Sequence, residues 1–166
     1  MKSIWQGVKF PTFESLSGDI STDVLIIGGG ISGLLTAYFL DRAGVDYLLV
    51  EKNKICSGVT ANTTAKITVG QGFNYHKILS LRGKETAQAY YHANKRAVKE
   101  YFSLCKNIDC DFEVKDNFVY SFEKHKIEKE LEALEKIGYK AEYCNKLNWP
   151  FETAGAVKTK GQAQFH

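Results

Sequence analysis

The sequence predicts an α/β fold, and three observations support this prediction. Residues 24–27 are all apolar and mostly β-branched, which is typical of a parallel strand covered on both faces. A glycine-rich turn and a helix follow this strand, and a second apolar strand at residues 47–50 comes directly after the helix. The remainder of the chain alternates helices with short strands, which indicates an α+β second half.

Three glycines after the first strand have the spacing Gly28-x-Gly30-x-x-Gly33. In a dinucleotide-binding turn, the first glycine allows a tight turn and the second lets a pyrophosphate approach the main chain. The third lets the helix pack closely on the strand. Unpaired N–H groups at the start of the helix, together with its dipole, favour an anion there. The spacing therefore predicts a diphosphate-binding turn.

The elements around the glycines favour a dinucleotide over an ordinary crossover without a ligand. An apolar stripe in residues 34–39 continues the helix, and Gly44 is placed to end it. The second strand ends in Glu51, whose carboxylate can accept hydrogen bonds from an adenosine ribose and disfavours a 2′-phosphate. An NAD-dependent dehydrogenase is a weaker alternative, because its sheet would continue with a third parallel strand soon after Glu51.

Composition narrows the class of protein. The 166 residues are 44% hydrophobic and 25% charged, as in an ordinary globular protein. The net charge of +3 comes from dispersed lysines, which does not indicate a nucleic-acid or membrane partner. No apolar run reaches the roughly 20 residues that span a bilayer, so we expect a cytoplasmic protein. The cysteines lack C-x-x-C spacing, so we expect reduced thiols and no metal site.

A long stretch at residues 52–72 is rich in threonine, glycine and asparagine and has little helical periodicity. It leaves from the end of the second strand, where cofactors lie in such folds. By composition alone, this stretch is either a ligand-contacting loop or an ordinary surface loop.

The second half contains several further predicted elements. We expect helices at 75–82 and 84–107 separated by Gly83, a hairpin of strands 111–115 and 118–122 turning at 115–117, a helix at 123–137 ended by Gly138, and strands at 139–144 and 155–159. The stripe of tyrosines and alanines in the long helix is typical of a core face.

Residues 23–52 and 58–68 resemble the N-terminal half of FAD-dependent oxidoreductases of the glycine/D-amino-acid oxidase (DadA-like) family. Segments 89–94 and 155–166 also resemble that family, most of all the bacterial branch whose longer members carry a C-terminal Rieske iron–sulfur domain. The resemblance implies an incomplete Rossmann-like FAD-binding domain at residues 1–83. Part of an α+β substrate domain would follow at residues 84–166.

The resemblance also implies a cofactor and its contacts. FAD would be held at its pyrophosphate by Gly28, Gly30, Ile31, Ser32 and Gly33, at its adenosine ribose by Glu51 and Lys52, and near its pyrophosphate and flavin by Thr60, Thr63, Thr64, Ala65 and Lys66. The implied reaction is oxidation of the C–N bond of a small-molecule amine or amino acid. No catalytic acid or base can be named from the sequence.

The family pattern continues beyond the elements found here. Its later glycine-containing segment, which returns to the FAD domain, has no counterpart after residue 145. The Rieske signature, Cys-x-His followed by Cys-x-x-His, has no counterpart either. We therefore expect a truncated N-terminal portion of a longer oxidoreductase, with the missing C-terminal portion or another subunit as its partner. The alternative is a non-catalytic dinucleotide-binding fragment.

Overall fold

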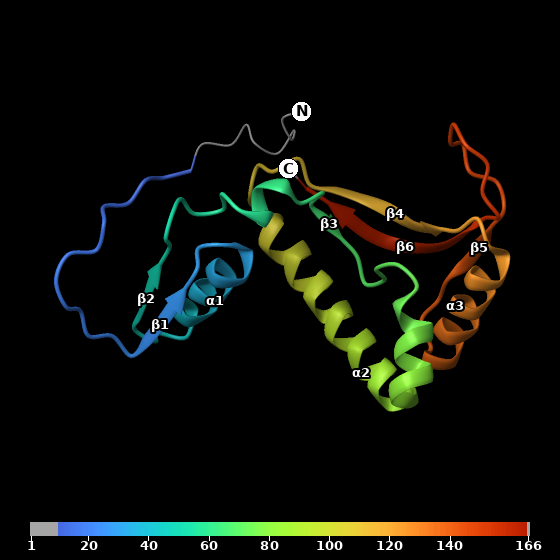
Figure 1. Cartoon of the computed structure of the whole chain (residues 1–166), viewed down its shortest axis with the longest axis horizontal. Coiled ribbons are helices and arrows are strands. Elements are labelled where there is room, and N and C mark those ends of the chain that lie inside the picture. The colour runs from blue at the N-terminus through green and yellow to red at the C-terminus, as the bar shows by residue number, and fades with distance from the viewer. Residues whose placement is uncertain (1–9, 166) are drawn as a thin grey trace. The chain divides into compact units, whose positions relative to one another are not determined.

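The computed structural model describes residues 10–165, and the chain divides into two units, Met1–Thr64 and Ala65–His166 (Figure 1). The boundary between them differs from the one predicted after residue 83. The short strand β3 (Lys66–Ile67) pairs with β6 (Ala156–Gln164), so it belongs with the second half of the chain.

The first unit contains the predicted strand–turn–helix–strand arrangement. Strand β1 (Val24–Ile27) pairs in parallel with β2 (Tyr47–Val50), and α1 (Ile31–Arg42) connects them. Ile26 and Ala37 are the buried residues of β1 and α1. A small alanine on the helix suits this close packing. These elements and their bounds confirm the strands and the helix expected from the apolar pattern.

One face of β1 is open to solvent. Leu25 is 55% exposed and Ile27 is 82% exposed, whereas Ile26 on the opposite face is buried. Within the described residues, 10–165, no element shields Leu25 and Ile27 from solvent. The apolar composition of β1 suits a sheet with two covered faces, and only one of them is covered here.

The second unit is built on an antiparallel sheet whose central strand is β6. One edge of β6 pairs with β4 (Glu113–Tyr120), and the other edge pairs with β5 (Glu142–Cys144) and then with β3. The strand predicted at 155–159 is thus longer than expected, because it runs the whole length of β4.

The predicted hairpin of residues 111–115 and 118–122 is wrong. Residues 113–120 form the single strand β4, whose pairing with β6 shifts register between Lys115 and Asn117. The Asp–Asn sequence that suggested a turn lies at this irregularity, as expected for a β-bulge. Asp116 there forms an ion pair with Lys158 of β6, with 2.9 Å between Oδ2 and Nζ.

Two helical segments flank the sheet. Helix α2 (Asn74–Cys105) is interrupted at Gly83, which has φ of 80° and ψ of 174°. Helix α3 (Lys124–Ile137) ends at Gly138 in the left-handed conformation. The two predicted glycine stops are confirmed, since both residues adopt a positive φ that favours glycine.

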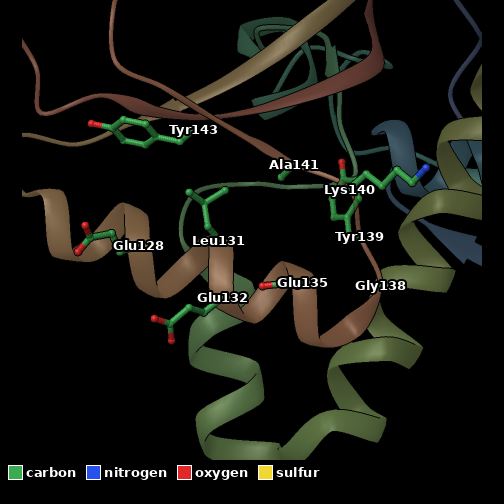
Figure 2. Close-up of a pocket in the computed structure, with 9 residues that line it drawn as sticks. All are labelled: Glu128, Leu131, Glu132, Glu135, Gly138, Tyr139, Lys140, Ala141 and Tyr143. Carbon is green, nitrogen blue, oxygen red and sulfur yellow. The ribbon is translucent and has the colours of Figure 1, made fainter.

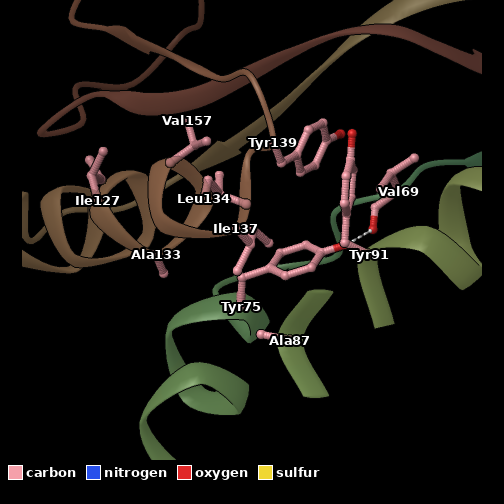
Figure 3. Packing of buried hydrophobic residues seen from close by; sticks show 10 residues of the cluster. All are labelled: Val69, Tyr75, Ala87, Tyr91, Ile127, Ala133, Leu134, Ile137, Tyr139 and Val157. Atoms are coloured by element: carbon pink, nitrogen blue, oxygen red, sulfur yellow. Dashed lines mark hydrogen bonds between the residues drawn. The ribbon is translucent and has the colours of Figure 1, made fainter. Parts of the chain in front are cut away.

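The core of the second unit lies among α2, α3 and the sheet (Figure 3). Ala87 and Tyr91 are buried, which confirms this part of the core face predicted for the long helix, whereas Ala97 is exposed. Tyr75, before Gly83, is buried as well. The Tyr91 and Tyr139 rings stack with centroids 4.8 Å apart, and Tyr139 also meets the edge of Tyr75. The other buried members of this cluster are Val69, Ile127, Ala133, Leu134, Ile137 and Val157.

A buried carboxylate caps the start of α2. Glu130 of α3 is only 2% exposed, and its two carboxylate oxygens accept hydrogen bonds from the N–H groups of Tyr75 (3.0 Å) and His76 (2.8 Å). Burial raises the pKa of Glu130, while the two hydrogen bonds act in the opposite direction. This side chain therefore satisfies two of the N–H groups that a helix start leaves without intrahelical partners.

Candidate cofactor site

The glycine turn has the main-chain shape that its spacing predicts. Gly28 has a φ of 108°, which a residue with a side chain rarely adopts, and its N–H donates to the Val50 carbonyl at 2.8 Å. A Cβ added to Gly33 would lie 1.9 Å from the Gly28 carbonyl oxygen. The turn and the start of α1 therefore approach each other too closely for any side chain at residue 33.

The start of α1 is open to an anion. Gly30 is the N-cap of the helix, has no side chain that could cap it, and no acidic residue lies in the first turn. The Ile31 N–H donates to the Thr60 hydroxyl at 3.1 Å, so the loop after β2 returns to the turn. A Cβ on Gly30 would be 3.4 Å from this hydroxyl, which is an ordinary contact. The fold itself thus tolerates a side chain at residue 30.

Glu51 lies against the turn. Its Oε2 accepts the N–H of Gly29 at 2.7 Å, and its Oε1 accepts the N–H of Asn53 at 2.9 Å. The hydrogen bonds from Asn53 and then Gly29 lower the pKa of the Glu51 carboxyl below its ordinary value. Each carboxylate oxygen keeps a further lone pair, so an ionised Glu51 can still accept a ribose hydroxyl.

The prediction from the sequence missed the role of Gly29. A Cβ at this residue would lie 2.9 Å from Cγ2 of Ile55 and 3.2 Å from the Cβ of Glu51. The Gly29 carbonyl also accepts the Cys56 N–H at 2.8 Å. The run of three consecutive glycines was the available signal, because the motif itself requires only the outer two. Gly29 is therefore a packing requirement that lets Glu51 and the loop approach the turn.

The structure brings only some of the predicted contacts together. Gly28, Gly30, Gly33, Glu51 and Thr60 surround one turn of the first unit. Ile31 and Ser32 also lie there, in the first turn of α1, and are exposed. The other predicted residues of that unit, Lys52, Thr63 and Thr64, are exposed as well. Ala65 and Lys66 belong to the second unit, where Ala65 is buried with a φ of 48° and Lys66 is exposed. A glycine turn, a helix start whose N-cap residue has no side chain, and a nearby carboxylate together fit a dinucleotide.

A protein-family model matches most of this chain. Residues 23–166 match the DAO family, described as FAD dependent oxidoreductase. The chain belongs to this family. FAD is accordingly the cofactor of its family, as the glycine spacing and the acidic residue after β2 suggested.

Relatives of this DAO-family chain include a Bacillus subtilis protein named as a Rieske 2Fe-2S iron–sulfur protein, YhfW. It is 35% identical over 94% of this chain and 32% of its own length. The γ-glutamylputrescine oxidoreductase of Escherichia coli is 26% identical over 80% of this chain and 32% of its own length. The chain therefore spans about a third of these relatives. The likeness to YhfW agrees with the Rieske-containing branch that the sequence resembles.

Two solved structures share the fold of this DAO-family chain. The L-amino acid deaminase of Proteus vulgaris has a TM-score of 0.62 and 16% identity, and the match covers 93% of this chain and 37% of the deaminase. The glycine oxidase of Bacillus cereus has a TM-score of 0.54 and 19% identity, covering 87% of this chain and 40% of the oxidase. These likenesses support the α/β fold predicted for the chain.

A hollow on the second unit is a poor site for the family's cofactor. It lies between α3 and the segment that leads into β5 (Figure 2). Glu128, Glu132 and Glu135 line it, together with Tyr139 and Tyr143. The lining includes three carboxylates and one cation, Lys140, so its net negative charge disfavours the diphosphate of FAD, whereas the glycine turn offers N–H groups and a helix start.

Within residues 10–165, no group of three or more His, Cys, Asp and Glu side chains could hold a metal ion. In the same part of the chain, no helix combines the length and apolar character that a bilayer crossing requires.

Proposed function

We propose that this chain provides the dinucleotide-binding start of an FAD-dependent oxidoreductase that oxidises the C–N bond of an amine or amino acid. The observation that carries the proposal is the hydrogen bond between the Glu51 carboxylate and the Gly29 N–H, which joins an acidic ribose-binding position to a glycine turn. Family membership supports the redox chemistry, and the names of the γ-glutamylputrescine oxidoreductase and the glycine oxidase support the substrate class.

Each residue around the turn has a proposed role toward FAD. The main chain of Gly28 and Gly30 would admit the pyrophosphate, and the N–H groups of Ser32 and Gly33 at the start of α1 would bind its oxygens. Ile31, whose N–H donates to the Thr60 hydroxyl, would lie beside the pyrophosphate. This arrangement needs no cationic side chain, because the helix start supplies partial positive charge.

The sugar and the loop have separate roles. Glu51 would accept the ribose hydroxyls, with Lys52 beside it. Thr60 already reaches the helix start through its hydroxyl, which supports a place for it beside the pyrophosphate. We assign Thr63, Thr64, Ala65 and Lys66 to the path from the pyrophosphate toward the flavin. Bound FAD would supply the electron sink for removing a hydride from the carbon beside the substrate amine.

A second candidate function is dinucleotide binding without catalysis. The chain spans about a third of the length of its curated relatives. We propose that the remaining FAD-binding elements are supplied by further residues of the same polypeptide or by another subunit.

We also propose a cytoplasmic location. The free thiols of the four cysteines support it, because disulfides are rare in that compartment.

The test is cofactor binding by the purified chain. We would measure its visible absorbance, identify the nucleotides it releases by mass spectrometry, and titrate the stripped protein with FAD and with ADP. We expect saturable FAD binding that is tighter than ADP binding, because the Thr63–Lys66 path would add contacts beyond the ADP half. Equal affinity for the two ligands would favour the non-catalytic alternative, and binding of neither would contradict both.

A further inference from the structure

Two cysteines lie on either side of the turn that joins α2 to β4. Cys105 is the last residue of α2, and Cys110 comes shortly before β4, which begins at Glu113. The chain turns directly after the helix, because the Ile108 N–H donates to the Cys105 carbonyl at 3.2 Å. Both cysteines belong to the unit Ala65–His166, so their arrangement does not depend on the first unit.

A contact between two rings holds the two sides of this turn together. The Phe102 ring of α2 and the Phe112 ring meet edge to face, with centroids 5.0 Å apart and planes at 80°. Phe102 precedes Cys105 by about one helical turn, and Phe112 follows Cys110 closely in the sequence. The ring contact therefore brings together the two stretches of chain that carry the cysteines.

The two thiols also interact with each other. Cys105 is buried, whereas Cys110 is only partly buried, and both are free thiols. Burial, together with the charge of Cys110 and a side-chain hydrogen bond with it, raises the pKa of the Cys105 thiol to about 11. Sulfur atoms that share a hydrogen bond lie close enough for a covalent bond to form after a small local movement.

We propose that Cys105 and Cys110 are a reversible redox pair, which hydrogen peroxide oxidises to a disulfide that closes the turn between α2 and β4. Cys110 reacts with the peroxide because it is the more exposed of the two. The buried Cys105 then reacts with the oxidised Cys110. This inference is independent of the proposed function, because neither cysteine is among the residues assigned to FAD.

The reaction balances with hydrogen peroxide as the oxidant. The Cys110 thiolate attacks one peroxide oxygen, so an S–O bond forms and the O–O bond breaks, and the departing hydroxide takes up the thiol proton to become water. The Cys105 thiolate then attacks the Cys110 sulfur, so the S–S bond forms and the S–O bond breaks. The second hydroxide takes up the Cys105 proton. Two thiols are oxidised by two electrons, and one peroxide is reduced to two waters.

The disulfide would act on the connection between the helix and the sheet. It would tie the end of α2 to the residues that lead into β4, which removes conformational freedom from the turn. We therefore expect slower hydrogen exchange in residues 106–112 after oxidation, and an upward shift of the urea midpoint of the chain. In a reducing compartment the pair would stay as thiols until peroxide is present, because disulfides there are usually transient.

The test is peptide mapping of the purified chain, fully reduced and then treated with hydrogen peroxide. Remaining thiols are alkylated before digestion to prevent exchange. Trypsin cuts after Lys106, between the two cysteines, so the disulfide would join peptides 100–106 and 107–115. We expect this linked pair, a loss of two of the four free thiols, and a mass lower by about 2 Da. Dithiothreitol should restore both thiols.

The matched variants are Cys110→Ser and Cys144→Ser. Cys144 is also partly buried, and its Sγ donates to the Lys146 carbonyl at 3.3 Å. We expect Cys144→Ser to form the linked peptides and to show the same slower exchange and higher urea midpoint as the unmodified chain. Cys110→Ser should form no linked peptides, and peroxide should leave its exchange rates and its urea midpoint unchanged.

Several results would overturn the redox pair. One is a peroxide-treated chain that keeps all of its thiols, or one in which Cys110 carries added oxygen without any disulfide. Another is a disulfide that maps to other cysteines, or linked peptides that occur only in a covalent dimer and disappear on dilution. Linked peptides with unchanged hydrogen exchange in residues 106–112 would contradict the closing of the turn. None of these measurements involves FAD, so the proposed function is tested separately.

Discussion

The glycine turn of the first unit and the segment at Val69 and Gly70 of the second unit (the Val69 segment) are fixed in different ways. The turn is shaped mainly by its main chain: Gly28 has a positive φ, and Gly33 leaves no room for a side chain. The Val69 segment is held by the side chains of Gln162, Tyr75 and Asn117, which come from three other elements.

This contrast concerns sequence distance as well as chemistry. The Glu51 carboxylate bonds a residue 22 positions away, within one strand–helix–strand unit. Gln162 bonds a residue 93 positions away, so its contact exists only once β6 occupies the centre of the sheet. The stability of a turn shaped by its main chain should therefore fall when a substitution adds volume. The stability of a segment held by side chains should fall when a substitution removes a hydrogen bond.

The largest expected effect is that of Gly33→Ala. The added Cβ would lie 1.9 Å from the Gly28 carbonyl oxygen, so the turn and α1 must separate. We expect a loss of about 3 kcal/mol or more in the free energy of unfolding of the first unit. Urea unfolding monitored by circular dichroism measures it. Gly58→Ala is the control, because a Cβ at Gly58 meets no atom within 4 Å; equal stability of the two variants would contradict the close approach.

Glu130→Ala tests another place where a side chain holds main-chain groups of a distant element, here the start of α2. The change leaves the N–H groups of Tyr75 and His76 without their carboxylate partner at a buried helix start. We expect a loss of about 2–3 kcal/mol in the free energy of unfolding, measured by the same urea titration. Glu132→Ala, on an exposed position of α3, is the matched control and should change stability by less than about 0.5 kcal/mol.

The pH dependence of stability separates Glu130 from the other carboxylates. Burial raises the pKa of Glu130, so the folded state holds its proton at a higher pH than the unfolded chain does. This contribution to stability is complete below the ordinary value of 4.5 and is lost as pH rises through the raised pKa. Glu130→Gln should abolish that fall when unfolding is followed from about pH 4 to pH 8. An unchanged pH profile would contradict the role given to burial.

The elements that could be predicted from the sequence were those specified locally. Gly83 and Gly138 interrupt or end helices because a positive φ is a property of one residue. The glycine spacing likewise placed Gly28 and Gly33 correctly, since their contacts lie within a single turn. Glu51 could be assigned to the same site because its strand is the next one along the chain.

The rest depended on contacts between distant segments. The Asp116–Asn117 sequence is compatible with a turn or a bulge, and only the pairing of β4 along β6 decides between them. Glu130 lies among apolar positions of α3, but its role requires the start of α2 beside it. Gln162 had no signal at all in the sequence, because its partner Val69 is set by the sheet order.

Gly30→Ala has the smallest expected effect on stability. It separates the role of Gly30 in ligand binding from the role of Gly33 in packing. A Cβ at Gly30 would make only an ordinary contact with the Thr60 hydroxyl, so we expect the free energy of unfolding to change by less than about 0.5 kcal/mol. The same Cβ would occupy the approach that a pyrophosphate needs, so FAD affinity should fall at least about tenfold. Urea unfolding and FAD titration of the one variant measure the two quantities. If Gly30→Ala binds FAD as the unmodified chain does, the pyrophosphate does not lie against this glycine. If it unfolds as easily as Gly33→Ala, the turn has no room for a side chain anywhere and the distinction between its packing glycine and its ligand-facing glycine is lost.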